Sequence, residues 1–403
     1  MKSSFPQDWK EYTIGDCLRR VEHPVEVDSD ALYTQIGICS HGKGLFYKEP
    51  VTGESLGNKA VYWVEPNCFI LNIVFAWEQA IGKTTQAEVG MIGSHRFPMY
   101  KPVNNLVDID YLVYYLLTKR GTDILEAASP GGAGRNRTLG QDRFMKSKIV
   151  LPPLDEQKKI AEILATQDKA IELQGRKIEE LKRFKKGCLE KMFPRKGQKV
   201  PEKRFPGFTD DWEQRKLTEF VEFFSGLTYT PNDVQENGTL VLRSSNVSNG
   251  EVVDADNVYV NPQVVNSENV KVGDIVVVVR NGSRSLIGKH AQIKTFMPNT
   301  VIGAFMTGIR SECPKFTNAL LNTSRFEEEI AMNMGATINQ ITGYMFSKME
   351  FKVPCLDEQK EIGEYFENLD HLITLHQRKL DEMKKQKKAL MQLLLTGIVR
   401  VRL

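Results

Sequence analysis

The sequence has no long apolar run and no pattern of metal-binding or disulfide-forming residues. None of its apolar stretches approaches the roughly 20 residues that a membrane-spanning helix needs, and its first residues, MKSSFPQDWKEY, contain no apolar core of a signal peptide. Its six cysteines are scattered, without a C-x-x-C pair and without a His/Cys cluster of zinc spacing. We therefore expect reduced thiols, no metal site and a cytoplasmic location.

A strong excess of one charge is also missing. The chain of 403 residues holds 54 Lys and Arg against 51 Asp and Glu, a net charge of +3. Domains that bind nucleic acid are usually more basic, so the total charge is no argument for DNA binding. The charge is uneven, however: residues 151–204 hold 15 basic and 9 acidic side chains, a local excess of +6. The length predicts two to four domains.

What the sequence does contain is a duplication. The segment PLDEQKKIAEIL, at 153–164, returns as CLDEQKEIGEYF at 355–366, and residues 151–193 align with 353–395 without a gap. In both copies, apolar residues recur at steps of three, four and seven, which predicts two amphipathic helices of more than 30 residues. Asp155 and Asp357 are the expected N-caps, and Pro194 is expected to end the first helix. Because one long amphipathic helix cannot bury its own apolar face, we expect the two helices to pack together as an antiparallel coiled coil.

The segments before each helix are duplicated only in outline. Strand-like runs include 60–64, 68–75, 240–243, 274–280 and 301–309, and helix-like runs include 108–120 and 318–333. The predicted fold is α+β, with two mixed α/β globules separated by two long helices in a pseudo-twofold internal repeat. The predicted boundaries are 1–150 for the first globule, 151–204 for the central helix and linker, 205–352 for the second globule, and 353–403 for the last helix.

This layout resembles the specificity subunit of type I restriction–modification systems. The resemblance rests on LPPLDEQKKIAEIL and VPCLDEQKEIGEYF, and on KVGDIVVVVRNGSRSLIGKHA and HGKGLFYKE in the globules. It implies a non-catalytic subunit whose two target-recognition domains each read one half of a split, asymmetric site in double-stranded DNA. It also implies methylation subunits, two in number, and restriction motor–nuclease subunits as partners. Those partners, not this chain, would carry S-adenosylmethionine, ATP and Mg²⁺.

Residue types then indicate which loops contact DNA. Arginine suits bidentate contact with guanine, and asparagine or glutamine suits adenine. The DNA-binding candidates are His41, Lys43, Arg135, Asn136, Arg137 and Thr138 in the first globule, and Arg243, Ser244, Asn246, Arg280, Asn281, Ser283, Arg284, Asn339 and Gln340 in the second. Each also has a purely structural interpretation; Asn281-Gly282, for example, is typical of a type I′ hairpin turn.

The repeated polar run at the helix starts suggests a repeated partner or repeated packing between domains. Its members are Leu154, Asp155, Glu156, Gln157, Leu356, Asp357, Glu358 and Gln359. Two other functions remain open: a stand-alone DNA methyltransferase or nuclease, and a coiled-coil adaptor with no DNA role. The sequence AIGKTT at 80–85 resembles the end of a phosphate-binding loop, but Trp77 stands where that motif requires glycine.

Overall fold

The computed structural model describes residues 5–131, 137–334 and 339–401. Contacts between residues divide the chain into two units. Unit 1 combines residues 1–174 with 379–403, and unit 2 consists of residues 175–378. Both units therefore contain one globule and a part of each long helix.

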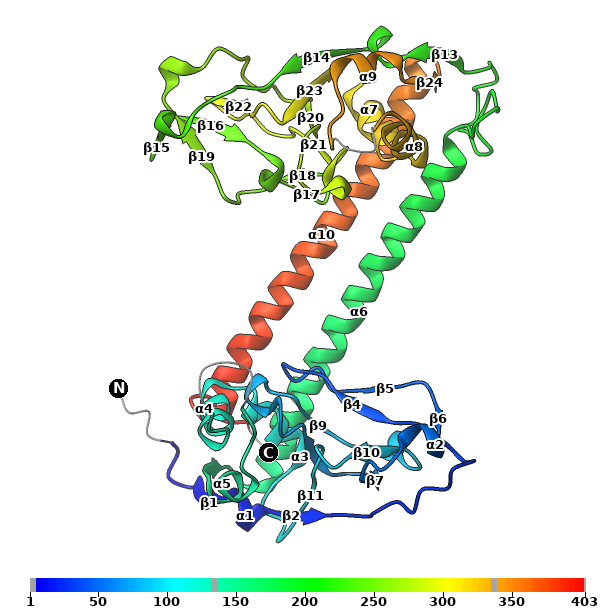
Figure 1. The fold of residues 1–403 in the computed structure, drawn as a ribbon. Helices are drawn as coiled ribbons and strands as arrows, with labels where there is room; N and C mark the ends of the chain where they lie inside the picture. Colours follow the sequence, from blue (N-terminus) through cyan, green and yellow to red (C-terminus); the bar gives the residue numbers. More distant parts are fainter. Residues whose placement is uncertain (1–4, 132–136, 335–338, 402–403) are drawn as a thin grey trace. The chain divides into compact units, whose positions relative to one another are not determined.

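Unit 1 is built around a four-stranded antiparallel sheet (Figure 1). Its order is β2 (Leu18–Val21), β11 (Met99–Pro102), β8 (Phe69–Leu71) and β9 (Ile81–Lys83). A separate pair, β1 (Lys10–Thr13) with β12 (Lys148–Leu151), joins the start of the globule to the strand that leads into the first long helix. Three short helices accompany the sheet: α3 (Ile109–Leu116), α4 (Lys119–Ala128) and α5 (Gln141–Lys146). Smaller pairs are β3 (Leu32–Tyr33) with β6 (Val51–Thr52), β4 (Ile36–Ile38) with β5 (Leu45–Tyr47), and β7 (Val61–Trp63) with β10 (Ile92–Ser94).

Unit 2 repeats this plan with a different sequence. Its corresponding sheet has the order β14 (Val221–Ser225), β23 (Met306–Ser311), β20 (Ile275–Val278) and β21 (His290–Gln292). Its corresponding pair is β13 (Glu213–Lys216) with β24 (Glu350–Val353), and its helices are α7 (Pro314–Leu321), α8 (Ser324–Asn333) and α9 (Gly343–Lys348). In both sheets the first strand in sequence pairs with the last, so the predicted duplication of the globules is confirmed in their topology.

Unit 2 adds a second four-stranded sheet and a hairpin. The sheet contains β15 (Val234–Gln235), β19 (Val258–Val260), β16 (Thr239–Leu242) and β22 (Thr300–Ile302), with β16 and β22 parallel. The hairpin joins β17 (Val247–Ser248) to β18 (Glu251–Val252). Its turn residues, Asn249 and Gly250, have φ angles of 52° and 76°, the left-handed values that a two-residue hairpin turn requires.

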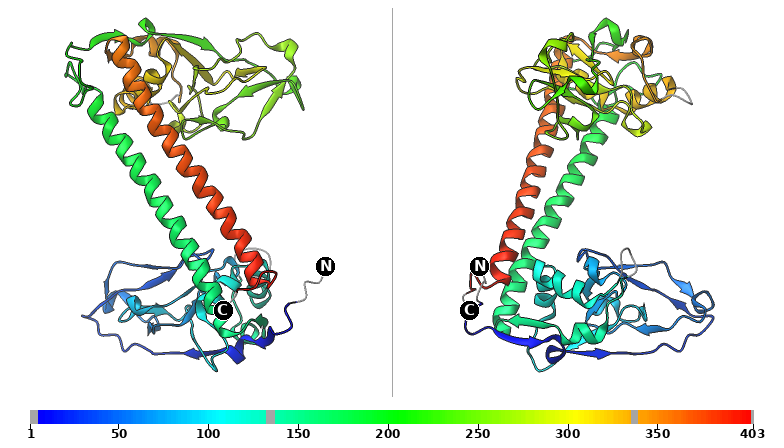
Figure 2. Two further views of the ribbon diagram at one scale, coloured as in Figure 1. Left: turned by 180° about the vertical axis from the view of Figure 1, so that it is seen from behind. Right: turned by 60° about the vertical axis from the view of Figure 1, so that its left-hand side comes forward.

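The two long helices are α6 (Leu154–Met192) and α10 (Leu356–Leu395). In unit 1 the first part of α6 lies beside the last part of α10 (Figure 2). There Lys387 Nζ lies 2.5 Å from Asp168 Oδ1. In unit 2 the equivalent pair is Lys185 with Asp370, at 2.6 Å. Also in unit 2, Cys188 Sγ lies 3.3 Å from Tyr365 Oη, so residue numbers fall along α10 as they rise along α6, and the predicted antiparallel packing is confirmed there. α6 ends two residues before Pro194, as predicted.

Three local predictions were wrong. Both long helices begin one residue before the aspartates expected as N-caps, so Asp155 and Asp357 lie in the first turn, where a negative charge still favours the helix dipole. The helix predicted at 108–120 is interrupted, because Thr118 caps the next helix, and Thr323 divides the run at 318–333 in the same way. The strand predicted at 301–309 is two strands, β22 and β23.

Candidate nucleic-acid interface

In unit 1, the connection between β8 and β9 holds a single turn of 3-10 helix, η1 (Ala76–Glu78). The indole Nε1 of Trp77 donates to the carbonyl oxygen of Val74 at 3.1 Å, which fixes the ring. The loop before α5 returns to this connection, since the amide of Leu139 donates to the carbonyl oxygen of Ile73 at 2.8 Å. On that loop, the guanidinium carbon of Arg137 lies 5.4 Å from the centre of the Trp77 ring.

The predicted loop at His41 reaches the same turn. The amide of His41 donates to Glu78 O at 2.8 Å, and that of Gly42 donates to Gln79 O at 2.9 Å. The backbone can make both bonds because His41 and Gly42 have φ angles of 61° and 62°. Structure therefore brings His41, Lys43, Arg137 and Thr138 to one edge of the fold, around η1. Arg135 and Asn136 lie outside the described residues, so their predicted roles stay predictions.

Unit 2 brings together three clusters that are far apart in sequence. Arg280, at the end of β20, forms an isolated β-bridge with Gln340. The amide of Asn281 donates to Asn339 O at 3.4 Å, and the side-chain amide of Asn339 donates to Gly282 O at 3.1 Å. The side-chain amide of Asn281 also donates to the hydroxyl of Ser244 at 3.1 Å. The β20–β21 loop thus meets the loop before α9, which repeats the arrangement of unit 1.

The cations at these two places come from loops in both units. Among the residues that the structure describes, none of Lys43, Arg137, Arg280 and Arg284 has a carboxylate within ion-pair distance. The guanidinium of Arg280 lies 5.0 Å from the centre of the Phe305 ring. This differs from Arg310 in the same unit, which binds Asp274 in a bidentate pair that raises its pKa. The unpaired cations retain their hydrogen-bond donors for an external acceptor.

Several candidate residues in the 243–246 cluster and in the 281–282 turn make bonds within the fold, and their predicted contacts with DNA stay predictions. Asn246 is buried, and its amide donates to Ala255 O and to the side chain of Asn257, so it holds its own loop. Arg243 is paired with Asp256 at 2.6 Å, and Ser244 accepts from Asn281. The type I′ turn predicted at Asn281-Gly282 is absent, because neither of these two residues has a positive φ. Ser283 is exposed, and its amide donates to Asn281 Oδ1.

Only some residues of the repeated run at the helix starts are exposed to solvent. Glu156 and Glu358 are buried and bind Arg400 and Arg204 respectively, each through two hydrogen bonds of 2.6–2.8 Å. Their neighbours Gln157 and Gln359 are buried as well, so these four residues fit the packing alternative rather than the docking one. Gln157 donates to the carbonyl oxygens of Leu106 and Pro152, and Gln359 donates to that of Pro354. Asp155, Leu356 and Asp357 are exposed, and Leu154 is half-buried.

Sequence reasoning missed the two aromatic residues that support the arginines. Trp77 was noted only as a mismatch to a phosphate-binding motif, and that motif lies in strand β9, where Lys83 pairs with Asp110 at 2.6 Å. Phe305 lies in the turn between β22 and β23, which the sequence did not reveal. Phe305 is 56% exposed, but Phe296 is 80% exposed, so what distinguishes Phe305 is the guanidinium of Arg280 beside its ring.

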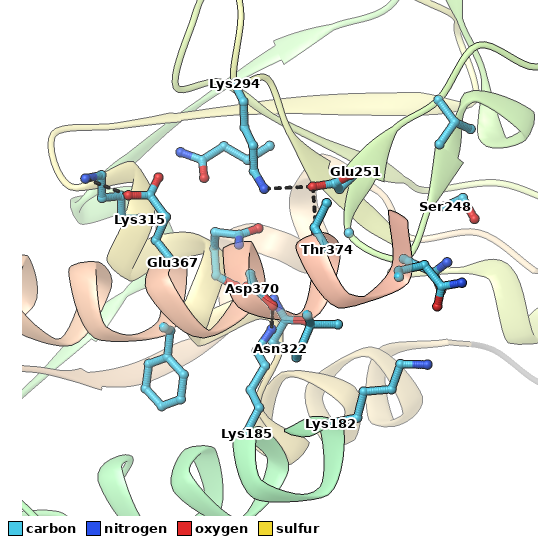
Figure 3. Close-up of a pocket in the computed structure, with 18 of the residues that line it drawn as sticks. Lys182, Lys185, Ser248, Glu251, Lys294, Lys315, Asn322, Glu367, Asp370 and Thr374 are labelled. Atoms are coloured by element: carbon cyan, nitrogen blue, oxygen red, sulfur yellow. Dashed lines mark hydrogen bonds and ion pairs between the residues drawn. The ribbon is translucent and has the colours of Figure 1, made fainter. Parts of the chain in front are cut away.

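A cavity of about 260 Å³ in unit 2 was also not predicted (Figure 3). It lies beside α10, and its wall carries three lysine–carboxylate pairs: Lys185–Asp370, Lys315–Glu367 and Lys294–Glu251. Burial tends to raise the pKa of Glu251, but the hydrogen bonds from Lys294 and Thr374 bring it below its ordinary value. The Thr374 hydroxyl on α10 donates to the Glu251 carboxylate at 3.0 Å, which fixes the β17–β18 hairpin to α10. Among the described residues, no group of three or more His, Cys, Asp or Glu side chains is placed to hold a metal ion.

Comparison with known proteins agrees with this architecture. A family model, the type I restriction modification DNA specificity domain, matches residues 6–183 and again 209–385. The chain belongs to this family. The two matches coincide with the two sequence repeats, and each includes one globule and most of the long helix that follows it.

The chain is similar to several specificity subunits. It is 26% identical over 424 aligned residues to the type I restriction enzyme MjaVIII specificity subunit of Methanocaldococcus jannaschii, covering 98% of this chain and 94% of that one. It is also 26% identical over 204 residues to the EcoKI specificity subunit of Escherichia coli, covering 48% and 44%. The fold of a solved S subunit from M. genitalium matches with a TM-score of 0.60 at 14% identity, over 98% of both chains.

These findings confirm the predicted role as the non-catalytic, DNA-recognising specificity subunit of a type I restriction–modification system. Specificity subunits of this family bind DNA and act with methylation and restriction subunits. No helix in the described parts of the chain is long and apolar enough to cross a membrane.

Proposed function

We propose that each unit reads one half of a bipartite, asymmetric site in double-stranded DNA. The observation that carries this proposal is the same in both units: loops distant in sequence converge beside the central strands, and they present cations that have no acidic partner among the residues that the structure describes. Unit 1 presents His41, Lys43 and Arg137, whereas unit 2 presents Arg280 and Arg284. Because the two sets differ, the two half-sites differ, whereas two identical readers would impose a palindrome.

The major groove is where such loops would read sequence. Only there does each base pair show a unique pattern of donors and acceptors. The near-neutral charge of the chain implies that it makes few phosphate contacts of its own. Weak binding by the isolated chain is therefore expected, with most of the phosphate contacts supplied by the partner subunits.

The long helices would set the spacing between the half-sites and dock two methylation subunits. Asp155, Leu356 and Asp357 are the exposed members of the repeated run and are the docking candidates that remain. We assign S-adenosylmethionine to the methylation subunits, and ATP and Mg²⁺ to the restriction subunits. We also propose a cytoplasmic location, because the proposed target is DNA.

Genome-wide mapping of DNA methylation with and without this chain tests the proposal. The expected result is a split motif with two unlike halves that is methylated only when the chain and its methylation subunits are both present. Methyl transfer by the purified chain alone would instead indicate a stand-alone methyltransferase. Absence of any sequence preference with the methylation subunits present would indicate a coiled-coil adaptor.

A further inference from the structure

The structure assigns a base to one arginine in each unit: we infer that Arg137 and Arg280 each read a guanine in the major groove, and that Trp77 and Phe305 orient them. This inference rests on the proposed function, and it specifies which side chains recognise DNA and which only shape the loops.

The first step is the elimination of the amide side chains of unit 2. The side chain of Asn281 donates to Ser244 and accepts from the amide of Ser283 at 2.9 Å, while that of Asn339 donates to Gly282 O. A bidentate contact with adenine requires both the oxygen and the nitrogen of the amide. Both side-chain atoms of Asn281 and the side-chain nitrogen of Asn339 already bond within the loops, so we assign to these two residues the role of positioning the loop.

The second step concerns the arginines. Arg280 is exposed, and neither it nor Arg137 has a carboxylate within ion-pair distance among the residues described. A guanidinium in this state keeps its forked N–H donors, whose geometry matches O6 and N7 of guanine.

The third step is orientation, which separates base reading from phosphate binding. Neutralising a phosphate needs only a nearby positive charge, whereas bidentate contact with a base edge needs a fixed guanidinium plane. The Trp77 ring is fixed by its bond to Val74 O. The Phe305 carbonyl oxygen accepts from the amides of Val279 at 3.0 Å and Arg280 at 3.2 Å. These bonds hold the backbone of Phe305 beside that of Arg280.

The two units reach this pairing by different routes. In unit 1 the aromatic ring comes from the β8–β9 connection and the arginine from the loop before α5. In unit 2 the arginine follows β20 and the ring comes from the turn before β23. In both units one member of the pair lies on the connection that follows the third strand of the central sheet, β8 in unit 1 and β20 in unit 2, while the other member comes from a different element.

The test measures binding of the chain with its methylation subunits to its own duplex site, with 7-deazaguanine placed at one guanine at a time. This analogue pairs normally but lacks the N7 acceptor. We expect one guanine in each half to be sensitive, with about a tenfold loss of affinity. Arg280→Gln should remove the sensitivity in one half only, and Arg137→Gln in the other.

The aromatic residues have a matched control. Phe305→Leu should weaken discrimination at the Arg280-dependent guanine by about two- to fivefold, because an exposed cation–π contact is modest. Phe296→Leu, which alters another highly exposed phenylalanine of unit 2, should change nothing. A merely structural role for Phe305 would lower affinity for every sequence equally and would overturn its assignment.

The outcomes separate this inference from the proposed function. If the complex prefers its site over scrambled DNA but no guanine is sensitive to 7-deaza substitution, the guanine assignment is wrong while the division into half-sites stands. The same holds if Arg280→Gln lowers only the salt dependence of binding, which is the signature of a phosphate contact. If the complex has no preference for any sequence, the proposed function itself fails.

Discussion

Replacing Glu358 by glutamine removes one negative charge from the buried start of α10 without changing the size of the side chain. The Glu358 carboxylate is fully buried and accepts two hydrogen bonds from Arg204, of which 16% is exposed; these bonds raise the pKa of Arg204. Breaking a fully buried pair costs about 3–5 kcal/mol. Partial hydration of Arg204 reduces this, so we expect Glu358→Gln to lower the free energy of unfolding by about 2–3 kcal/mol.

Glu156→Gln is the matched control at the start of α6. Its partner Arg400 is 40% exposed and keeps two hydrogen bonds to Asp8, at 2.9 and 2.7 Å, after the substitution. Because Arg400 is partly exposed and retains Asp8 as a counter-ion, we expect Glu156→Gln to lower the free energy of unfolding by about 1 kcal/mol or less.

Thermal unfolding measures the difference, and hydrogen exchange assigns it to unit 2. For a unit of this size, 1 kcal/mol shifts Tm by about 2–4 °C, so Glu358→Gln should lower it by about 4–12 °C. The double variant Arg204→Met/Glu358→Leu should recover most of the loss, because an apolar pair needs no counter-ion. Equal effects of Glu358→Gln and Glu156→Gln would refute the reasoning.

Two further predictions concern the globules. Burial lowers the pKa of His290, so the folded state keeps its ring neutral while the unfolded chain takes up a proton below about pH 6.5. The free energy of unfolding of unit 2 should therefore be at its full value above that pH and fall below it. Urea titrations of His290→Gln should lose this pH dependence, and an unchanged pH dependence would contradict the prediction. Gly42→Ala should destabilise unit 1 by more than the roughly 1 kcal/mol of backbone strain, because the new Cβ would lie 2.5 Å from Leu117. The control Gly44→Ala has open space around the new Cβ and should show the strain alone. Equal shifts in Tm for the two variants would show that the contact with Leu117 does not matter.

The parts of the fold that follow from the sequence are those with local, periodic causes. The stripes on α6 and α10 predicted the long helices and their pairing, since the same apolar spacing recurs over many turns. The division of 301–309 into two strands was not predictable, because its residues are apolar and β-forming throughout and the turn at Phe305 is fixed by hydrogen bonds to the end of another strand.

Burial of the repeated acidic residues has a non-local cause. Glu156 and Arg400 are 244 residues apart in the chain, and Glu358 and Arg204 are 154 apart, so no window of sequence shows that these charges meet. For the same reason, residue type alone selected Arg137 and Arg280 as candidates along with Arg243, which is neutralised by Asp256. Only the folded chain separates the cations that are paired from those that are not.

The most direct test of the account is the methylated motif of cells that carry either of two altered chains. With Arg280→Ala/Arg284→Ala, the account predicts that one half of the motif becomes degenerate and the other half is retained. Arg137→Ala should give the reverse pattern. Loss of selectivity in both halves with either chain would contradict the claim that each unit reads its own half of the site.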